Sequence, residues 1–165
     1  MKSWKQPATA ALVSGSLAAV TSTAALAACG ATEISRPLAP TNAVSHWFFG
    51  ERATRQDRFS WRHTVVGYAT HHVASLFWAF LYERFFAARR ARATPGRLVG
   101  DAIAVAGVAC FVDYQLTPRR FVPGYERRLS RTSLALVYLA FAAGLAAGGA
   151  LLNRRLNRHD GQLTD

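Results

Sequence analysis

Residues 64–86 read TVVGYATHHVASLFWAFLYERFF, and this stretch decides the fold class of the chain. From Thr64 to Tyr82 it contains no Lys, Arg, Asp or Glu, whereas Arg62 and Glu83 bound it on either side. As a helix the uncharged part rises about 28 Å, which is enough to cross the hydrocarbon core of a bilayer. The stretch therefore predicts an integral membrane protein.

The same stretch contains two adjacent histidines, His71 and His72, far from either end. Ionisable groups inside a membrane are costly and usually face protein or water rather than lipid. Neighbouring helical side chains point about 100° apart, so both histidines cannot face one bundle axis. The main interpretation is one hydrogen-bonded core histidine and one at a helix interface; a metal site and a proton or solute path are the alternatives.

Three further apolar segments accompany residues 64–86, at about 8–30, 98–116 and 132–153. Together they predict an all-α fold, an integral membrane antiparallel bundle of four transmembrane helices, with 1–165 as a single membrane domain.

Small residues recur at helical spacing in three of these segments, and such spacing lets two helices approach closely. The three sets that we expect to pack are Ser14, Ala18 and Ser22; Gly100, Ala104 and Gly107; and Gly144 with Gly148.

The N-terminal segment has two interpretations. A charge-free run over 6–32 follows Lys2 and Lys5, which suits a retained first helix or a secretory signal. The run Leu26-Ala27-Ala28-Cys29 also resembles the lipobox of bacterial lipoproteins. Because three membrane spans follow, we expect the first helix to be retained.

The first loop contains an aromatic segment at about 41–53. Pro37 and Pro40 end any preceding helix, and the segment NAVSHWFFGERA places Val44, Trp47 and Phe48 on one face of a short helix. This helix is expected to lie along the membrane interface. A loop with a few buried aromatics is the alternative.

The chain is basic, with 20 Lys and Arg against 9 Asp and Glu and a net charge of +11. The arginines flank the apolar spans, which indicates contact with the anionic headgroups of a lipid bilayer. There is no basic stripe interleaved with stacking aromatics, so nucleic acid is not an expected partner. The arginine density of the second loop, 84–97, favours a topology with both termini in the cytoplasm.

Matched depths on antiparallel spans predict a polar intramembrane layer made of His71, His72, Asp113 and Tyr138. A carboxylate beside an imidazole favours the charged pair, and a tyrosine hydroxyl can satisfy the spare acceptor.

A second polar cluster is expected on the opposite side, around the arginine-rich loop. Glu83 and Asp101 lie near its start and its end, with Arg84 and Arg97 as their partners.

Three segments are similar to those of small proteobacterial inner-membrane proteins of unknown activity: PTNAVSHWFFGERA, GYATHHVASLFWAFLYE and TPRRFVPGYERRLS. The helix count and the Pro-rich first loop also resemble the YagU-like group. The resemblance implies a four-helix protein of the bacterial inner membrane, and it implies no catalytic residues.

Two functions are predicted. The first is a non-enzymatic structural or accessory membrane component, whose polar layer holds the bundle together and whose partner is a second copy or another membrane protein. The second is a small transporter or a proton or ion pathway that uses His71, His72 and Asp113. An enzyme ranks third, because the sequence has no His-Glu-x-x-His, no paired Glu-x-x-His motif and no nucleophile motif. No cofactor and no metal is expected.

Overall fold

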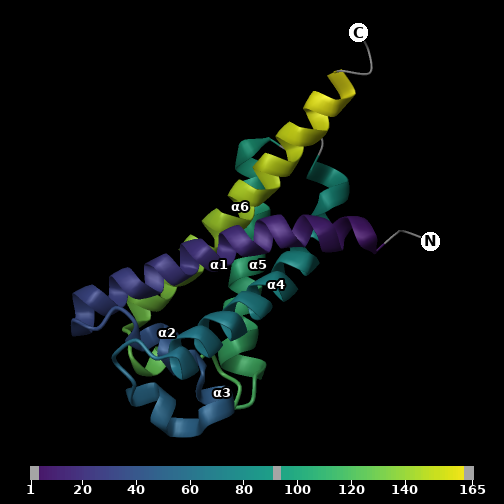
Figure 1. Cartoon of the computed structure of the whole chain (residues 1–165). Coiled ribbons are helices and arrows are strands. Elements are labelled where there is room, and N and C mark those ends of the chain that lie inside the picture. The colour runs from purple at the N-terminus through teal and green to yellow at the C-terminus, as the bar shows by residue number, and fades with distance from the viewer. Residues whose placement is uncertain (1–3, 91–93, 162–165) are drawn as a thin grey trace.

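The computed structural model describes residues 4–90 and 94–161, and every regular element in these ranges is a helix (Figure 1). The all-α prediction is therefore confirmed. Residues 91–93 of the arginine-rich loop lie outside the described part. The four long helices are α1 (Lys5–Ile34), α4 (Val66–Arg90), α5 (Pro95–Phe111) and α6 (Arg131–Gly161).

Short helical segments connect the long helices. They are α2 (Ala39–Val44), α3 (His46–Phe49), η1 (Gly50–Arg55), η2 (Trp61–Val65), η3 (Val112–Leu116) and η4 (Tyr125–Arg127). The η2 and η3 segments are single π-helical turns that continue directly into α4 and out of α5. We call α2, α3 and η1 together the cap, since they cover one end of the bundle (Figure 1).

Three helices in the described part of the chain are long and apolar enough to cross a membrane: Lys5–Ile34, Pro95–Leu116 and Arg131–Arg154. The helix α4 is also long, but it is not among the three. Its histidines, tyrosines and terminal charges lower its hydropathy, although its central stretch has no Lys, Arg, Asp or Glu. The chain is thus a helical protein with three membrane-capable helices.

The helix α1 is the centre of the packing. It packs against α4 on one side and α6 on the other, and α5 in turn packs against α6. Ser22 of α1 contacts His71 near the start of α4, whereas Trp4 stacks on Phe80 toward its end. These contacts show that α1 and α4 run antiparallel. Contacts between neighbouring helices follow the order α4, α1, α6, α5, and α5 also contacts α4.

The helices α1 and α6 cross with their backbones in contact (Figure 1). Ser14 and Ala18 of α1 are fully buried. A Cβ atom added to Gly144 would lie 2.5 Å from the Cα of Ala18, and one added to Gly148 would lie 2.4 Å from the Cα of Ser14. The predicted packing role of these small residues is confirmed, because no larger residue fits between the two helices.

The third small-residue set does not pack within the chain. A Cβ atom added to Gly100 or Gly107 would meet no atom within 4 Å, and Ala104 between them is exposed. The prediction of a packing face here is wrong for the isolated chain. The opposite face of α5, which carries Ala102 and Val105, is the buried one.

The cap replaces the single helix that we expected over 41–53. The helix is interrupted at Ser45 and again at Gly50, whose φ is +67°. The buried Asn42 holds the segment against the following chain. Its side-chain amide donates to two backbone carbonyls beyond η1, each at 3.0 Å, and its carbonyl accepts from the Thr64 hydroxyl at 2.7 Å. The expectation of buried aromatics holds for part of the segment only, since Phe48 is 66% exposed.

The close crossing of α1 and α6 generates a test. We expect Gly144→Ala and Gly148→Ala each to destabilise the protein by about 1–3 kcal/mol, because the added methyl forces the backbones apart. Thermal unfolding in detergent measures the effect. The matched control is Gly107→Ala, which removes a helix-interior glycine without a clash and should stabilise by up to about 1 kcal/mol. Equal effects at all three positions would contradict the crossing.

Candidate functional site

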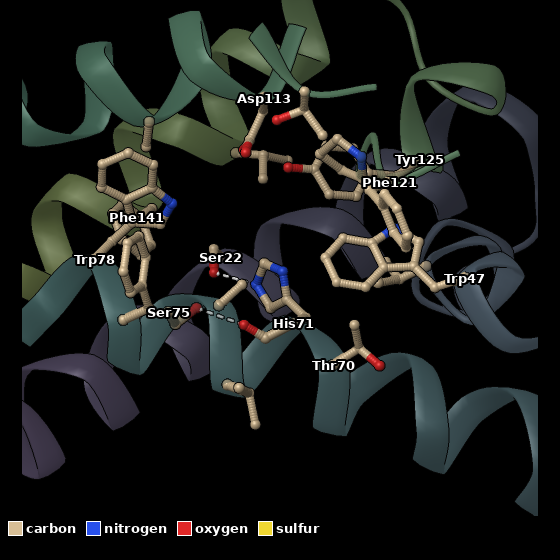
Figure 2. Close-up of a pocket in the computed structure, with 18 of the residues that line it drawn as sticks. Ser22, Trp47, Thr70, His71, Ser75, Trp78, Asp113, Phe121, Tyr125 and Phe141 are labelled. Atoms are coloured by element: carbon tan, nitrogen blue, oxygen red, sulfur yellow. Dashed lines mark hydrogen bonds between the residues drawn. The ribbon is translucent and has the colours of Figure 1, made fainter. Parts of the chain in front are cut away.

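A cavity of about 750 Å³ lies between α4 and the end of α5 (Figure 2). The helix α4 packs mainly against α1 and α5 mainly against α6, whereas α4 and α5 contact each other less closely, which leaves the space between them. Most of its lining is apolar, and the aromatic members are Trp47, Phe48, Phe77, Trp78, Phe121, Tyr125, Tyr138 and Phe141.

One polar group of the cavity is a chain of hydrogen bonds that ends on Asp113. The Tyr125 hydroxyl donates to the Tyr138 hydroxyl at 3.3 Å, and the Tyr138 hydroxyl donates to Asp113 Oδ2 at 2.6 Å. Burial raises the pKa of the Tyr125 phenol well above its usual range, so this hydroxyl keeps its proton. Both tyrosine protons thus point along the chain toward Asp113, whose carboxylate is the final acceptor.

The second polar group is His71, on the opposite wall. Its Nε2 lies 2.8 Å from Ser22 Oγ, and the Ser22 hydroxyl donates its own proton to the carbonyl of Ala18 at 2.6 Å. A hydroxyl has one proton, so Ser22 must accept from His71. The Nε2 of His71 therefore carries the hydrogen, and in the neutral ring Nδ1 is an acceptor. Figure 2 shows that this second nitrogen faces the cavity.

His72 lies on another side of α4, between α4 and α1. Its Nε2 lies 3.2 Å from Ser16 Oγ, and its Nδ1 lies 3.2 Å from the Tyr68 hydroxyl. It does not line the cavity. The two histidines diverge as the helical geometry requires, and only His71 shares the cavity with Asp113.

The predicted polar layer is thus brought together in part. His71, Asp113 and Tyr138 surround one cavity, and the tyrosine hydroxyl bonds the carboxylate. A direct carboxylate–imidazole pair is not found: among the described residues, the hydrogen bonds of Asp113 and of His71 go to Tyr138 and Ser22 respectively.

The second predicted cluster has a different arrangement. Glu83 is fully buried, Arg84 lies over the ring of Trp4 at 5.1 Å, Arg97 is exposed and Asp101 is half-buried. Within the described ranges, no ion pair joins Asp101 to Arg97.

Two of the described ion pairs instead join the first loop to the loop after α5. Arg127 pairs with Glu51, and Arg128 pairs with Asp57. The hydrogen bond from Arg127 lowers the pKa of the Glu51 carboxyl, which is therefore ionised at neutral pH. These pairs hold the cap over the end of the cavity.

Three site residues were not predicted from the sequence. Tyr125 and Phe121 come from the loop after α5, and Trp47 comes from the cap. The Trp47 indole donates to the backbone carbonyl of Val122 at 2.9 Å, and its ring packs edge-on against Phe121 at 5.6 Å. The sequence shows that both loops carry aromatic residues, but it does not show that the two loops contact each other, because that contact depends on the tertiary structure.

The donor set is unsuited to a metal in the described ranges, where no three His, Cys, Asp or Glu side chains come together. What the cavity offers is an apolar aromatic wall with two hydrogen-bond acceptors.

Comparisons with protein families, with curated proteins and with solved structures find no match to this chain.

The tyrosine chain predicts an energetic coupling that can be measured. In a double-mutant cycle, Asp113→Asn and Tyr138→Phe should be non-additive by about 0.5–1.5 kcal/mol, because each removes one side of the same buried hydrogen bond. Thermal unfolding in detergent provides the free energies. The control cycle pairs Asp113→Asn with His72→Leu, which should be additive since His72 bonds elsewhere. Coupling of Asp113 to His72 as strong as that to Tyr138 would refute this arrangement.

Proposed function

We propose that this protein is a non-catalytic, four-span protein of the bacterial inner membrane that binds a small, largely apolar molecule between α4 and α5. The cavity carries this proposal, since its volume of about 750 Å³ and its aromatic lining match those of sites that hold small ligands. A binding role suits an accessory membrane component, either alone or beside a partner protein.

The position of α4 supports a fourth span. It runs antiparallel to α1, which is one of the three membrane-capable helices, and contacts it from Ser22 back to Trp4. A helix that lies alongside a spanning helix over this distance shares its depth in the bilayer. The His72 side chain, which is the most costly group for lipid contact, is bonded to Ser16 of α1.

The surface of the cap region supports contact with a charged membrane interface. Trp61 is 78% exposed and Phe59 lies against it edge-on at 5.4 Å. Arg62 lies over the ring of Phe49 at 4.3 Å. Aromatic rings beside arginines are typical of the headgroup region, where the arginines meet anionic lipids. With both termini in the cytoplasm, this surface faces the periplasmic leaflet.

A proton or ion pathway is the weaker candidate. Beyond the cavity, the buried side chains between the four long helices are mainly apolar, and they include Ala79, Ala102 and Leu145. His72 faces away from the cavity, so His71, His72 and Asp113 do not line one route. Asp113 and His71 therefore form two separate polar sites on the walls of one cavity, which suits binding better than conduction.

Topology gives the first test. Reporters of cytoplasmic location fused before Met1 and after Asp165 should both be active, because four spans return the chain to its starting side. Matched periplasmic reporters at the same two positions are the control and should be inactive. If α4 does not span, three crossings remain and the two termini report opposite sides, which would overturn the four-span proposal.

Filling the cavity gives the second test. Ala74 lines the cavity and is only partly buried, so Ala74→Phe should occupy part of the volume without disturbing the core. We expect at least about a tenfold loss in the small apolar molecules that co-purify with the protein, measured by mass spectrometry after extraction. The control Val108→Phe adds the same ring on an exposed site of α5 outside the cavity. Equal co-purification with both variants would remove the basis for the proposed binding function.

A further inference from the structure

The polar groups of the cavity restrict the head group of its ligand, and this inference rests on the proposed binding function. The cavity has one carboxylate and one imidazole on opposing walls, supplied by Asp113 and His71. Their hydrogen-bond partners decide what each can offer to a bound molecule.

Asp113 offers a negative acceptor. The Tyr138 hydroxyl donates to Asp113, and the Tyr125 hydroxyl donates to that of Tyr138, so both hydroxyl protons point toward the carboxylate. No described ion pair includes Asp113, and its side chain is only partly buried against the cavity. A carboxylate in apolar surroundings gains most from a cation that also donates hydrogen bonds.

His71 offers a neutral acceptor. Its Nε2–H donates to Ser22 Oγ, and the Ser22 hydroxyl donates to the Ala18 carbonyl. Its Nδ1 has no hydrogen-bond partner among residues 4–90 and 94–161, and it faces the cavity (Figure 2). A ligand group near both walls therefore meets two acceptors and needs donors of its own.

The rest of the cavity suits a hydrocarbon chain. Phe77, Trp78 and Phe141 line it on the side away from the cap. Among the residues that the structure describes, no arginine or lysine lines the cavity, although the chain carries a net charge of +11. An anionic head group would therefore lie beside Asp113 without a cation to balance it.

We propose that the cavity binds a single-chain cationic amphiphile whose head is a primary ammonium, with its N–H groups donating to Asp113 and His71 and its chain lying along the aromatic wall. The ammonium supplies a positive charge and three donors, and the site supplies a carboxylate and an imidazole acceptor with no arginine or lysine from the described residues.

The test uses the whole protein in nanodiscs of uncharged lipid and dodecyl chains brominated near their ends, at neutral pH. Bromine quenches tryptophan fluorescence at short range. Of the two tryptophans that line the cavity, Trp78 lies on the side that would hold the chain end, whereas Trp47 lies in the cap. Trp78→Phe should remove most of the saturable quenching. The matched control is Trp4→Phe, because Trp4 stacks on Phe80 at the far end of α4 and does not line the cavity.

Four head groups on the same chain separate the contributions. Dodecylammonium should bind at least about tenfold more tightly than dodecanol, which has a donor without charge, or dodecyltrimethylammonium, which has charge without N–H donors. Dodecanoate should bind most weakly. Binding of dodecanol, dodecyltrimethylammonium or dodecanoate within threefold of dodecylammonium would overturn the proposal for a primary ammonium.

Two variants locate the head group. Asp113→Asn should remove most of the preference for ammonium over alcohol, whereas Asp101→Asn on the same helix, outside the cavity, should leave it unchanged. His71→Gln keeps a donor for Ser22 and removes Nδ1, and it should weaken dodecylammonium binding by about tenfold. A full preference retained in both variants would overturn the assignment, with thermal unfolding showing that each variant is folded.

The outcome also separates this inference from the proposed function. Saturable quenching that depends on Trp78 but is equal for all four head groups would leave a binding protein without the head-group selectivity inferred here. The absence of Trp78-dependent quenching by any of the four would count against both.

Discussion

The close contact of α1 with α6 is the constraint on which the rest of the structure depends. Ser14 and Ala18 meet Gly144 and Gly148 with almost no side-chain volume between the two backbones. In a membrane, where lipid is as apolar as the helices, such close van der Waals packing supplies much of the association energy. Because α1 and α6 occupy the centre, α4 and α5 are left on the outside.

The cavity follows from this arrangement. The helix α4 packs mainly against α1 and α5 mainly against α6, and the space between α4 and α5 is closed only partly by side chains. The cap and the loop after α5 close one end through Trp47, Phe121 and Tyr125, and the pairs of Arg127 with Glu51 and Arg128 with Asp57 fasten the two segments to each other. The site is therefore built by the packing order of the helices, and polar groups are added to its walls.

Local patterns in the sequence predicted much of the helical framework. Long uncharged runs predicted long helices, and small residues at four-residue spacing predicted that α1 and α6 each pack closely against a neighbour, without showing that they pack against each other. The same kind of pattern failed for Gly100, Ala104 and Gly107, because spacing shows that a face can pack closely but does not show that a partner is present. The hydropathy of α4 also differs from that of the other long helices, since His71, His72 and its tyrosines serve contacts inside the protein.

The site was harder to predict, for a geometric reason. Depth along the helices placed His71, Asp113 and Tyr138 at one level, but depth does not give the rotation of each helix about its axis. That rotation sends His72 to Ser16 and leaves His71 facing Asp113 across a space rather than bonded to it. Tyr125 was missed because it comes from a turn whose position depends on the folded cap.

The α1–α6 crossing has a consequence for how the chain can change over evolutionary time. A backbone contact without intervening side chains allows very little variation at Ser14, Ala18, Gly144 and Gly148. A larger residue at one of these positions requires a compensating substitution on the facing helix. The outward face of α5 has no such restriction. Relatives of this protein should therefore share a slowly diverging seam of small residues, while the outer faces of the flanking helices remain free to diverge.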